Sequence, residues 1–67
     1  MNRIKHIRQK RGIQQKELAA AVNVSQPYMH DLELGARGAK PETWQRIADA
    51  LGVPVEQLKG KEERHAG

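Results

Sequence analysis

Apolar residues along the chain recur with a helical period, and turn-favouring residues separate them into five short segments. The most regular segment begins at Pro41, and its apolar residues at positions 44, 47, 48 and 51 have the i, i+3, i+4, i+7 spacing of an amphipathic helix. Proline is favoured at the first position of a helix and glycine directly after its end, which fits Pro41 and Gly52. The pattern therefore predicts a helix over 41–51.

Four further helices are predicted from capping and helix-ending residues: about 2–11, from Gln14 to Asn23, about 26–34, and from Pro54 to Gly60. Asn2 and Ser25 are favoured N-caps, because their side-chain oxygens accept hydrogen bonds from free backbone N–H groups in the first turn. Glu17 stands three residues after Gln14, as in a capping box, although Gln14 is a weak cap. Glycine or asparagine ends each of the first four helices, and both residues tolerate the left-handed conformation.

Short helices joined by tight turns, without the alternation of a strand, predict a compact all-α fold of five helices. The domain is expected to span 1–60, and residues 61–67, which are mostly charged or small, to form a frayed tail. The inward-facing positions of the helices form the predicted core: Ile4, Ile7, Leu18, Ala19, Val22, Met29, Leu32, Trp44, Ile47, Leu51, Val55 and Leu58.

Length and composition restrict the class of protein. A chain of 67 residues forms one small domain, and the absence of cysteine excludes disulfides and thiolate metal sites. No apolar run approaches the roughly 20 residues that cross a bilayer, and no signal-peptide pattern is present. We expect a soluble, cytoplasmic protein with no membrane contact, no metal and no cofactor.

Charge is distributed unevenly along the chain. Twelve Lys and Arg against eight Asp and Glu give a formal net charge of +4. All the acids lie from Glu17 onward, whereas the first sixteen residues carry only bases: Arg3, Lys5, Arg8, Lys10, Arg11 and Lys16. A one-sided basic surface is typical of a protein with a polyanionic partner, although solvated basic helices are also common.

The segment from Gln15 to Leu34 predicts a helix, a very short turn and a second helix with a polar outer surface. This is the geometry of a DNA-binding helix-turn-helix, although a generic antiparallel pair of helices has similar spacing. The order of residues is more specific. It resembles the lambda-repressor-like helix-turn-helix family (Xre/Cro type) at Gln15-Lys16-Glu17-Leu18-Ala19, Val22-Asn23-Val24-Ser25, Tyr28-Met29, Leu32-Glu33 and Gly35. The resemblance continues through Pro41, Ile47-Ala48, Ala50-Leu51-Gly52-Val53 and Leu58, and so covers roughly 2–60.

The resemblance implies a lambda-repressor-like DNA-binding domain of a transcriptional regulator, most often a repressor, that binds double-stranded DNA with the helix at 26–34 in the major groove. It also implies phosphate contacts at the start of the helix-turn-helix and in the loop after it, from Gln14, Gln15, Arg37 and Lys40. The N-terminal amides of a helix form an anion site themselves. The alternative for Gln15 is an ordinary exposed residue at the start of a helix.

The resemblance implies base contacts from outward residues near the start of the recognition helix: Gln26, Pro27, Tyr28 and Asp31. Gln26 can bond adenine bidentately, with a phosphate contact alone as the alternative, and Pro27 offers only apolar contact. Tyr28 reaches the DNA backbone or is partly buried. Asp31 repels phosphates unless it accepts from cytosine, and a pair with Lys16 is the other possibility. His30 is interpreted as an ordinary exposed residue.

Arg8 and Glu33 are expected to form a structural ion pair, because each lies beside a core position and the family has an Arg–Glu bridge between these helices. If the pair is partly buried, it orients the recognition helix, and loss of one member leaves an uncompensated charge. Glu33 is therefore interpreted as structural rather than catalytic.

Useful affinity from one short recognition helix normally requires two copies on a palindromic operator, so we expect a homodimer, at least on DNA. The sequence shows no separate oligomerisation domain, and the dimer surface is expected around Val53, Val55 and Leu58. An alternative function is an antitoxin-like or antagonist-controlled regulator that acts chiefly through a protein partner. An enzyme is not expected, because the histidines are scattered and no catalytic motif is present.

Overall fold

The computed structural model describes residues 2–59 and contains, within that range, five α-helices and no strand. The helices are α1 (Ile4–Lys10), α2 (Gln15–Ala21), α3 (Gln26–Leu34), α4 (Pro41–Leu51) and α5 (Val55–Lys59). The predicted all-α, five-helix fold is confirmed. The tail predicted at 61–67 and the stop predicted at Gly60 lie outside the described residues.

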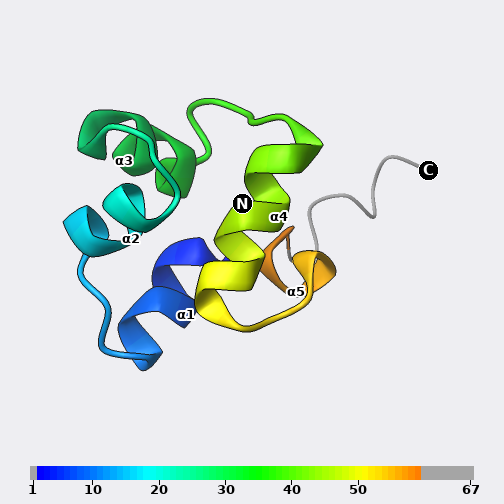
Figure 1. Cartoon of the computed structure of the whole chain (residues 1–67). Coiled ribbons are helices and arrows are strands. Elements are labelled where there is room, and N and C mark those ends of the chain that lie inside the picture. The colour runs from blue at the N-terminus through cyan, green and yellow to red at the C-terminus, as the bar shows by residue number, and fades with distance from the viewer. Residues whose placement is uncertain (1, 60–67) are drawn as a thin grey trace.

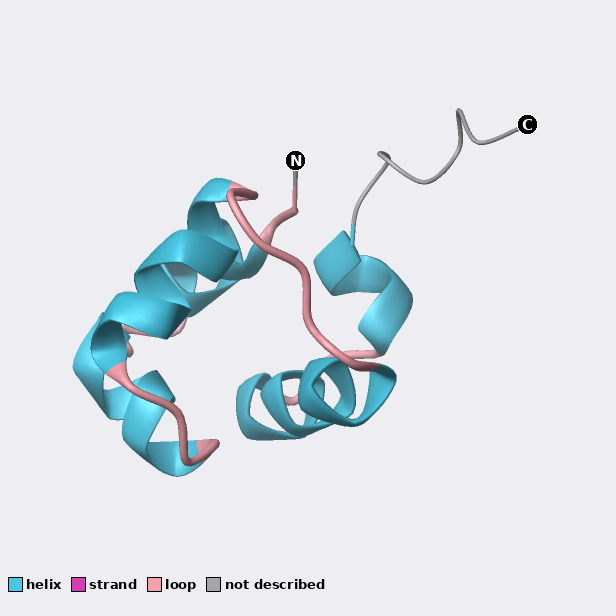
Figure 2. Ribbon diagram, turned by 90° about the horizontal axis from the view of Figure 1, so that it is seen from above, coloured by secondary structure: helices cyan, strands magenta, loops and turns pink. Residues whose placement is uncertain are grey.

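The helices form two groups that meet along a shared core. In Figure 1, α2 and α3 lie on one side and α4 and α5 on the other, and α1 packs against both α2 and α5. A backbone hydrogen bond of 2.7 Å from Arg3 N–H to the Leu58 carbonyl joins the start of the described chain to α5. Figure 2 shows the loop between α3 and α4, residues 35–40, bridging the two groups. The outer side of α3 is left uncovered.

The first helix is shorter than the sequence predicts, and Arg3, not the predicted Asn2, stands at its N-cap position. The Asn2 side-chain oxygen accepts from Ile4 N–H at 3.1 Å, and regular helix begins only at Ile4. The same amide donates to the Leu32 carbonyl at 2.7 Å. Asn2 therefore tethers the chain start to α3, which holds it outside regular helix, and the predicted bounds of 2–11 were too wide.

Both ends of α3 are fixed by the residues expected there. Ser25 Oγ accepts from Tyr28 N–H at 3.2 Å, which satisfies one free donor of the first turn. Gly35 adopts the left-handed conformation, with φ of 79°, and its N–H donates back into the helix. Asn23, in the short turn before α3, has φ of 63°. These local features set where α3 begins and ends.

The core confirms most of the sequence prediction and corrects it at three positions. The buried apolar residues are Ile4, Ile7, Leu18, Ala19, Val22, Met29, Leu32, Ile47, Ala48, Leu51 and Leu58. Trp44 and Val55, predicted as core, are only partly buried and pack against its edge. The large indole of Trp44 lies under the Lys59 ammonium, which is 5.6 Å from the ring centroid. The small Ala48, which the prediction omitted from the core, is fully buried. None of the helices in the described part of the chain has the length and apolar character needed to cross a membrane.

Candidate nucleic-acid interface

The uncovered side of α3 carries a stripe of residues one helical turn apart. Pro27, His30 and Leu34 are exposed and Asp31 is half-buried, at the i, i+3, i+4, i+7 positions of one helix face. Gln26 is exposed at the start of the helix. We call these five residues the outer face of α3. Met29 and Leu32 are fully buried, so the helix is fixed to the core by its inner side.

The start of α2 and the outer face of α3 together form a shallow hollow of about 390 Å³. It is lined by Gln15, Gln26, Pro27, His30 and Asp31. The structure therefore gathers Gln15 and three of the four residues proposed as base contacts at one place. The lining offers amides, a carboxylate, an imidazole and an apolar ring within a single helix-turn-helix.

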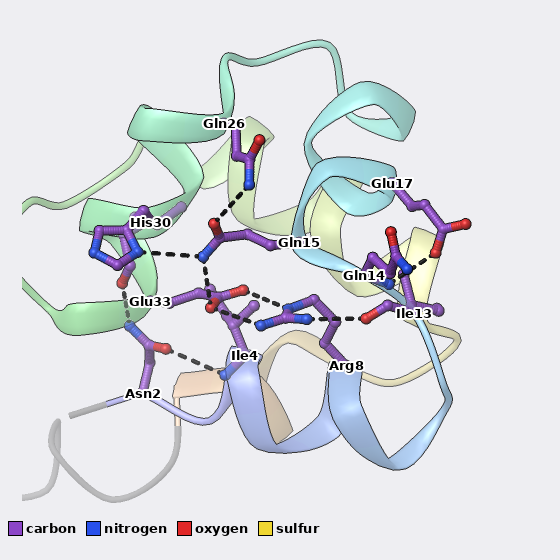
Figure 3. A network of polar contacts seen from close by, with 11 residues as sticks. Asn2, Ile4, Arg8, Ile13, Gln14, Gln15, Glu17, Gln26, His30 and Glu33 are labelled. Atoms are coloured by element: carbon purple, nitrogen blue, oxygen red, sulfur yellow. Dashed lines mark hydrogen bonds and ion pairs between the residues drawn. The ribbon is translucent and has the colours of Figure 1, made fainter.

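Gln15 connects this hollow to the interior, as Figure 3 shows. Its Oε1 accepts from Gln26 Nε2 at 3.2 Å, and its Nε2 donates to Glu33 Oε1 at 3.1 Å. The same Nε2 lies 3.5 Å from His30 Nδ1. Gln15, which the sequence analysis assigns to a phosphate contact, thus bridges α2 and α3. It holds Gln26 through one of the two hydrogens on Gln26 Nε2.

Below Gln15, Arg8 and Glu33 form a buried, bidentate ion pair between α1 and α3. Arg8 Nε lies 2.7 Å from Glu33 Oε2, Arg8 Nη2 lies 3.1 Å from Oε1, and the side chains are 9% and 3% exposed. Arg8 Nη1 also donates to the Ile13 carbonyl at 2.9 Å, just before α2. Removing one member of such a pair strands a buried charge at a cost of about 3–5 kcal/mol. The pair locks the position of α3 relative to α1.

Tyr28 lies apart from the outer face of α3 and packs, half-buried, against the core. The Arg37 guanidinium from the following loop sits 4.6 Å from the centroid of its ring, within cation–π distance. Partial burial was one of the two alternatives for Tyr28. Arg37 is exposed, so the ring orders a positive charge beside the start of α3.

Asp31 lines the hollow, and no ionic partner for it lies within the described residues. Among residues 2–59 it forms no ion pair, so the alternative pair with Lys16 is absent there. A half-buried carboxylate on the outer face of α3 opposes phosphate and favours a hydrogen-bond donor. The Asp31 carboxylate therefore favours a hydrogen-bond donor over a phosphate as the group that lies against the hollow.

The remaining predicted phosphate contacts lie around this face. Gln14 is exposed at the start of α2; its N–H donates to Glu17 Oε1 at 2.7 Å, and Figure 3 draws it away from Gln26. Lys40 is exposed at the N-cap position of α4, at the far end of the loop that carries Arg37. The structure does not bring Gln14 or Lys40 into the hollow.

Two residues of the outer face were not expected to contribute. His30 lines the hollow and neighbours Gln15, and its spacing of three from Pro27 and four from Gln26 was a signal that could have placed it there. Leu34 is 56% exposed although it is a large apolar residue. It stands two positions after the buried Leu32, which puts it off the core register.

Among residues 2–59, no group of three or more His, Asp or Glu side chains is arranged to hold a metal ion. The side chains of the hollow donate and accept hydrogen bonds from fixed positions on a rigid helix. Such a set of donors and acceptors is suited to pairing with a complementary set on another surface.

Comparison with known proteins finds the same helical segments in other chains. The model of the helix-turn-helix family matches residues 4–58. The HTH-type transcriptional regulator DdrOP3 of Deinococcus deserti is 39% identical over 56 residues, which cover 84% of this chain and 43% of that protein. The immunity repressor protein of Bacillus phage phi105 is 37% identical over 60 residues, 90% of this chain and 42% of that protein. The chain thus spans less than half the length of these curated relatives.

Solved structures show the same fold. The clp gene regulator ClgR from C. glutamicum superposes with a TM-score of 0.74 at 32% identity, over 79% of this chain and 69% of that one. A hypothetical transcription factor from Neisseria, NHTF, gives a TM-score of 0.76 at 25% identity, over 94% of this chain and 73% of that one.

Proposed function

The chain belongs to the helix-turn-helix family of the lambda-repressor-like (Xre/Cro) type, and from this premise we propose that it binds double-stranded DNA sequence-specifically as a transcriptional repressor. The observation that carries the proposal is the hydrogen bond of 3.2 Å by which Gln15 holds Gln26 on the outer face of α3. It fixes an amide at the tip of an exposed helix, where a major groove would meet it.

Gln26 is the proposed main base contact, and the structure supports the chemistry atom by atom. One hydrogen on its Nε2 points to Gln15 Oε1. The other hydrogen and the Oε1 acceptor are left for a base, and adenine offers the matching N7 acceptor and N6 donor in the major groove. A pre-positioned amide loses less conformational entropy when it binds, which favours this bidentate contact.

The other residues of the hollow are assigned by their chemistry. Pro27 can contact a thymine methyl group, and Asp31 can accept from a cytosine amino group while excluding other bases by repulsion. His30 is added to the interface because it lines the same hollow. Tyr28 is assigned an indirect role, since its ring lies against the Arg37 guanidinium.

Phosphate contacts come from the periphery of the interface. The free N–H groups at the start of α2, beside Gln14, are donors for one phosphate, and Arg37 and Lys40 can reach the backbone from the loop. The role of Gln15 changes from the sequence interpretation, because its two polar atoms already bond Gln26 and Glu33. We propose that it positions Gln26 first and contacts phosphate second.

A homodimer on a palindromic operator is proposed from the size of the interface, because a single α3 spans only a few base pairs. Of the residues expected at the dimer surface, Val53 and Val55 are half-buried and available at the edge of the core. Leu58 is completely buried and does not belong to any such surface. The dimer contact is therefore assigned to Val53 and Val55.

A second candidate is the regulator that acts chiefly through a protein antagonist or toxin. The observation that favours it is a groove between α1 and α5, away from the outer face of α3, whose lining includes the basic residues Arg3, Lys10 and Arg11.

Selection of bound duplexes from a random pool tests the proposal. We expect enrichment of a palindrome whose half-sites are centred about 34 Å apart, one helical turn of DNA. Affinity should fall steeply with salt, since about 0.9 of an ion is released for each phosphate contacted. A pool that shows no enriched sequence after repeated rounds, with folded protein, contradicts sequence-specific binding.

A further inference from the structure

A groove of about 520 Å³ lies between α1, α5 and the turn after α4, and it is larger than the hollow beside α3. Its lining consists of Arg3, His6, Ile7, Lys10, Arg11, Val53 and Gln57. None of these residues belongs to the outer face of α3 or to the Arg8–Glu33 network. The groove is therefore a separate surface that the proposed DNA contact leaves unused.

The rim of the groove is basic and contains no acid. Arg3, His6, Lys10 and Arg11 are all exposed. Within residues 2–59 the ion pairs are Arg8–Glu33 and Arg46–Glu42, so no described carboxylate neutralises the rim. Like charges gathered on one side of a helix repel one another, and folding gains nothing from that arrangement. Such a departure from the rules of stability is expected at a binding surface.

The geometry distinguishes the class of anion. Arg3 to Arg11 is eight residues, which is about 12 Å along α1, so the charges form a row rather than converging on one point. The lining also includes two apolar residues, the buried Ile7 and the half-buried Val53, which we call the apolar base of the groove. A compact anion needs converging donors, and a nucleic-acid backbone presents a closely spaced row of phosphates with no protruding aliphatic side chain to enter the groove.

We propose that the groove binds an acidic segment of a partner protein, whose carboxylates lie one turn apart against the rim and whose apolar side chain covers Ile7 and Val53. The charge row and the apolar base match an amphipathic acidic segment in both features. The groove shares no residue with the outer face of α3, so the partner does not block that face. It does share Val53 with the proposed dimer contact, so partner binding competes with dimerisation there.

The test uses the full chain labelled with ¹⁵N and an acetylated peptide of 14 residues, with Glu at every third or fourth position and Leu beside them. We expect saturable amide shifts at α1, Val53 and Gln57. A peptide with Gln in place of every Glu should bind at least about fivefold more weakly, which corresponds to the loss of exposed ion pairs. Absence of saturable binding below 1 mM, on the order of the weakest specific contacts, overturns the proposal.

Variants localise the effect. Lys10→Glu and Arg3→Glu should each weaken the acidic peptide about fivefold, whereas Arg46→Glu, with the same charge change on exposed α4, should weaken it less than about twofold. Arg3→Glu guards against misfolding, because an acid suits the start of α1. Equal losses in all three variants would mean non-specific attraction and would overturn the proposal.

A 16-base-pair duplex added to the same labelled protein completes the experiment. Duplex shifts confined to α2 and α3 support a groove that is reserved for protein. Duplex shifts at the groove in place of α3 overturn the assignment to protein. Because the two ligands are followed at different amides, a failure of DNA binding at α3 is separated from a failure of peptide binding at α1.

Discussion

Helices α3 and α4 bury the same number of side chains, but they differ in the kinds of residue that they bury and expose. In α4, Ile47, Ala48 and Leu51 are buried, and the exposed positions are largely polar or small. In α3 the buried set includes the charged Glu33, while the apolar Leu34 and Pro27 face outward. The fourth helix is a regular amphipathic helix, and the third departs from that pattern on both of its sides.

The difference separates what folding requires from what binding requires. The buried positions of α4 lie on one apolar stripe. The two departures in α3 are linked through Gln15, which bonds the buried Glu33 with one atom and the exposed Gln26 with another. We infer that the buried Glu33 fixes α3 to the rest of the domain. The exposed Pro27 and Leu34 are then available to contact a binding partner.

The largest expected effect on stability comes from breaking the Arg8–Glu33 ion pair on the inner side of α3. Arg8→Met leaves the Glu33 carboxylate buried without its bidentate partner. We expect the free energy of unfolding to fall by about 3–5 kcal/mol, measured by urea denaturation followed by Trp44 fluorescence. A small domain has little stability to spare, so this variant is expected to be partly unfolded.

The paired variant separates charge from packing. Arg8→Met combined with Glu33→Leu replaces the ion pair by apolar groups and should regain most of the lost stability. A loss below about 1 kcal/mol for Arg8→Met alone would contradict the view that the pair locks α3.

The corresponding change in α4 is Leu51→Ala, which removes a fully buried side chain. We expect a loss of about 2–5 kcal/mol in the same assay, from lost transfer energy and a residual cavity. Trp44→Ala removes the only tryptophan, so both variants are compared by urea denaturation followed by circular dichroism. Trp44→Ala should cost less than a fully buried aromatic residue does, because Trp44 packs only at the edge of the core. A larger loss for Trp44→Ala than for Leu51→Ala would show that the edge has been assigned wrongly.

The starts of the two helices offer a finer comparison. Ser25 caps α3 with a hydrogen bond to Tyr28 N–H, whereas Lys40 at the same position of α4 makes no side-chain cap. Ser25→Ala should cost about 1 kcal/mol of unfolding free energy. Lys40→Ala serves as the control and should change stability by less than about 0.5 kcal/mol. Equal losses would refute the capping role of Ser25.

The smallest effect on stability is expected on the outer face of α3. Leu34→Gln should change the free energy of unfolding by no more than about 0.5 kcal/mol, because the side chain is already 56% exposed. If the outer face of α3 contacts DNA, affinity for a selected duplex should still fall about fivefold, or about 1 kcal/mol. Ala50→Gln, on the exposed side of α4, is the control in a fluorescence anisotropy titration. Unchanged affinity for Leu34→Gln would exclude Leu34 from the interface.

The inner side of the molecule could be predicted because burial imposes a period. Ile47 and Leu51 follow from helical spacing, and Gly35 and Ser25 follow from capping chemistry. Trp44 shows the limit of that approach, since spacing places a residue on a face but does not say how near it lies to the end of the core. The predicted helix bounds at Asn2 failed for a related reason, because its hydrogen bond to Leu32 depends on tertiary structure.

The candidate interface could be predicted only in part. Gln26, Pro27 and Asp31 were placed by resemblance to a family, and the structure gathers them in one hollow. The bridging position of Gln15 and the stacking of Arg37 on Tyr28 depend on side chains from different elements, which no local pattern encodes. His30 was missed because it was interpreted as an ordinary exposed residue, although its spacing from Gln26 and Pro27 places it on the same helix face.

The most direct test of the account compares Gln26→Ala with Lys40→Ala on a selected duplex and on a random one. For Gln26→Ala we predict a loss of about 5- to 150-fold on the selected duplex and less than about threefold on the random one, because a bidentate base contact contributes about 1–3 kcal/mol of discrimination. Lys40→Ala should weaken both duplexes alike, and Gln15→Ala should do so while also eroding discrimination. Equal losses on the two duplexes for Gln26→Ala would contradict the claim that α3 recognises bases through this amide.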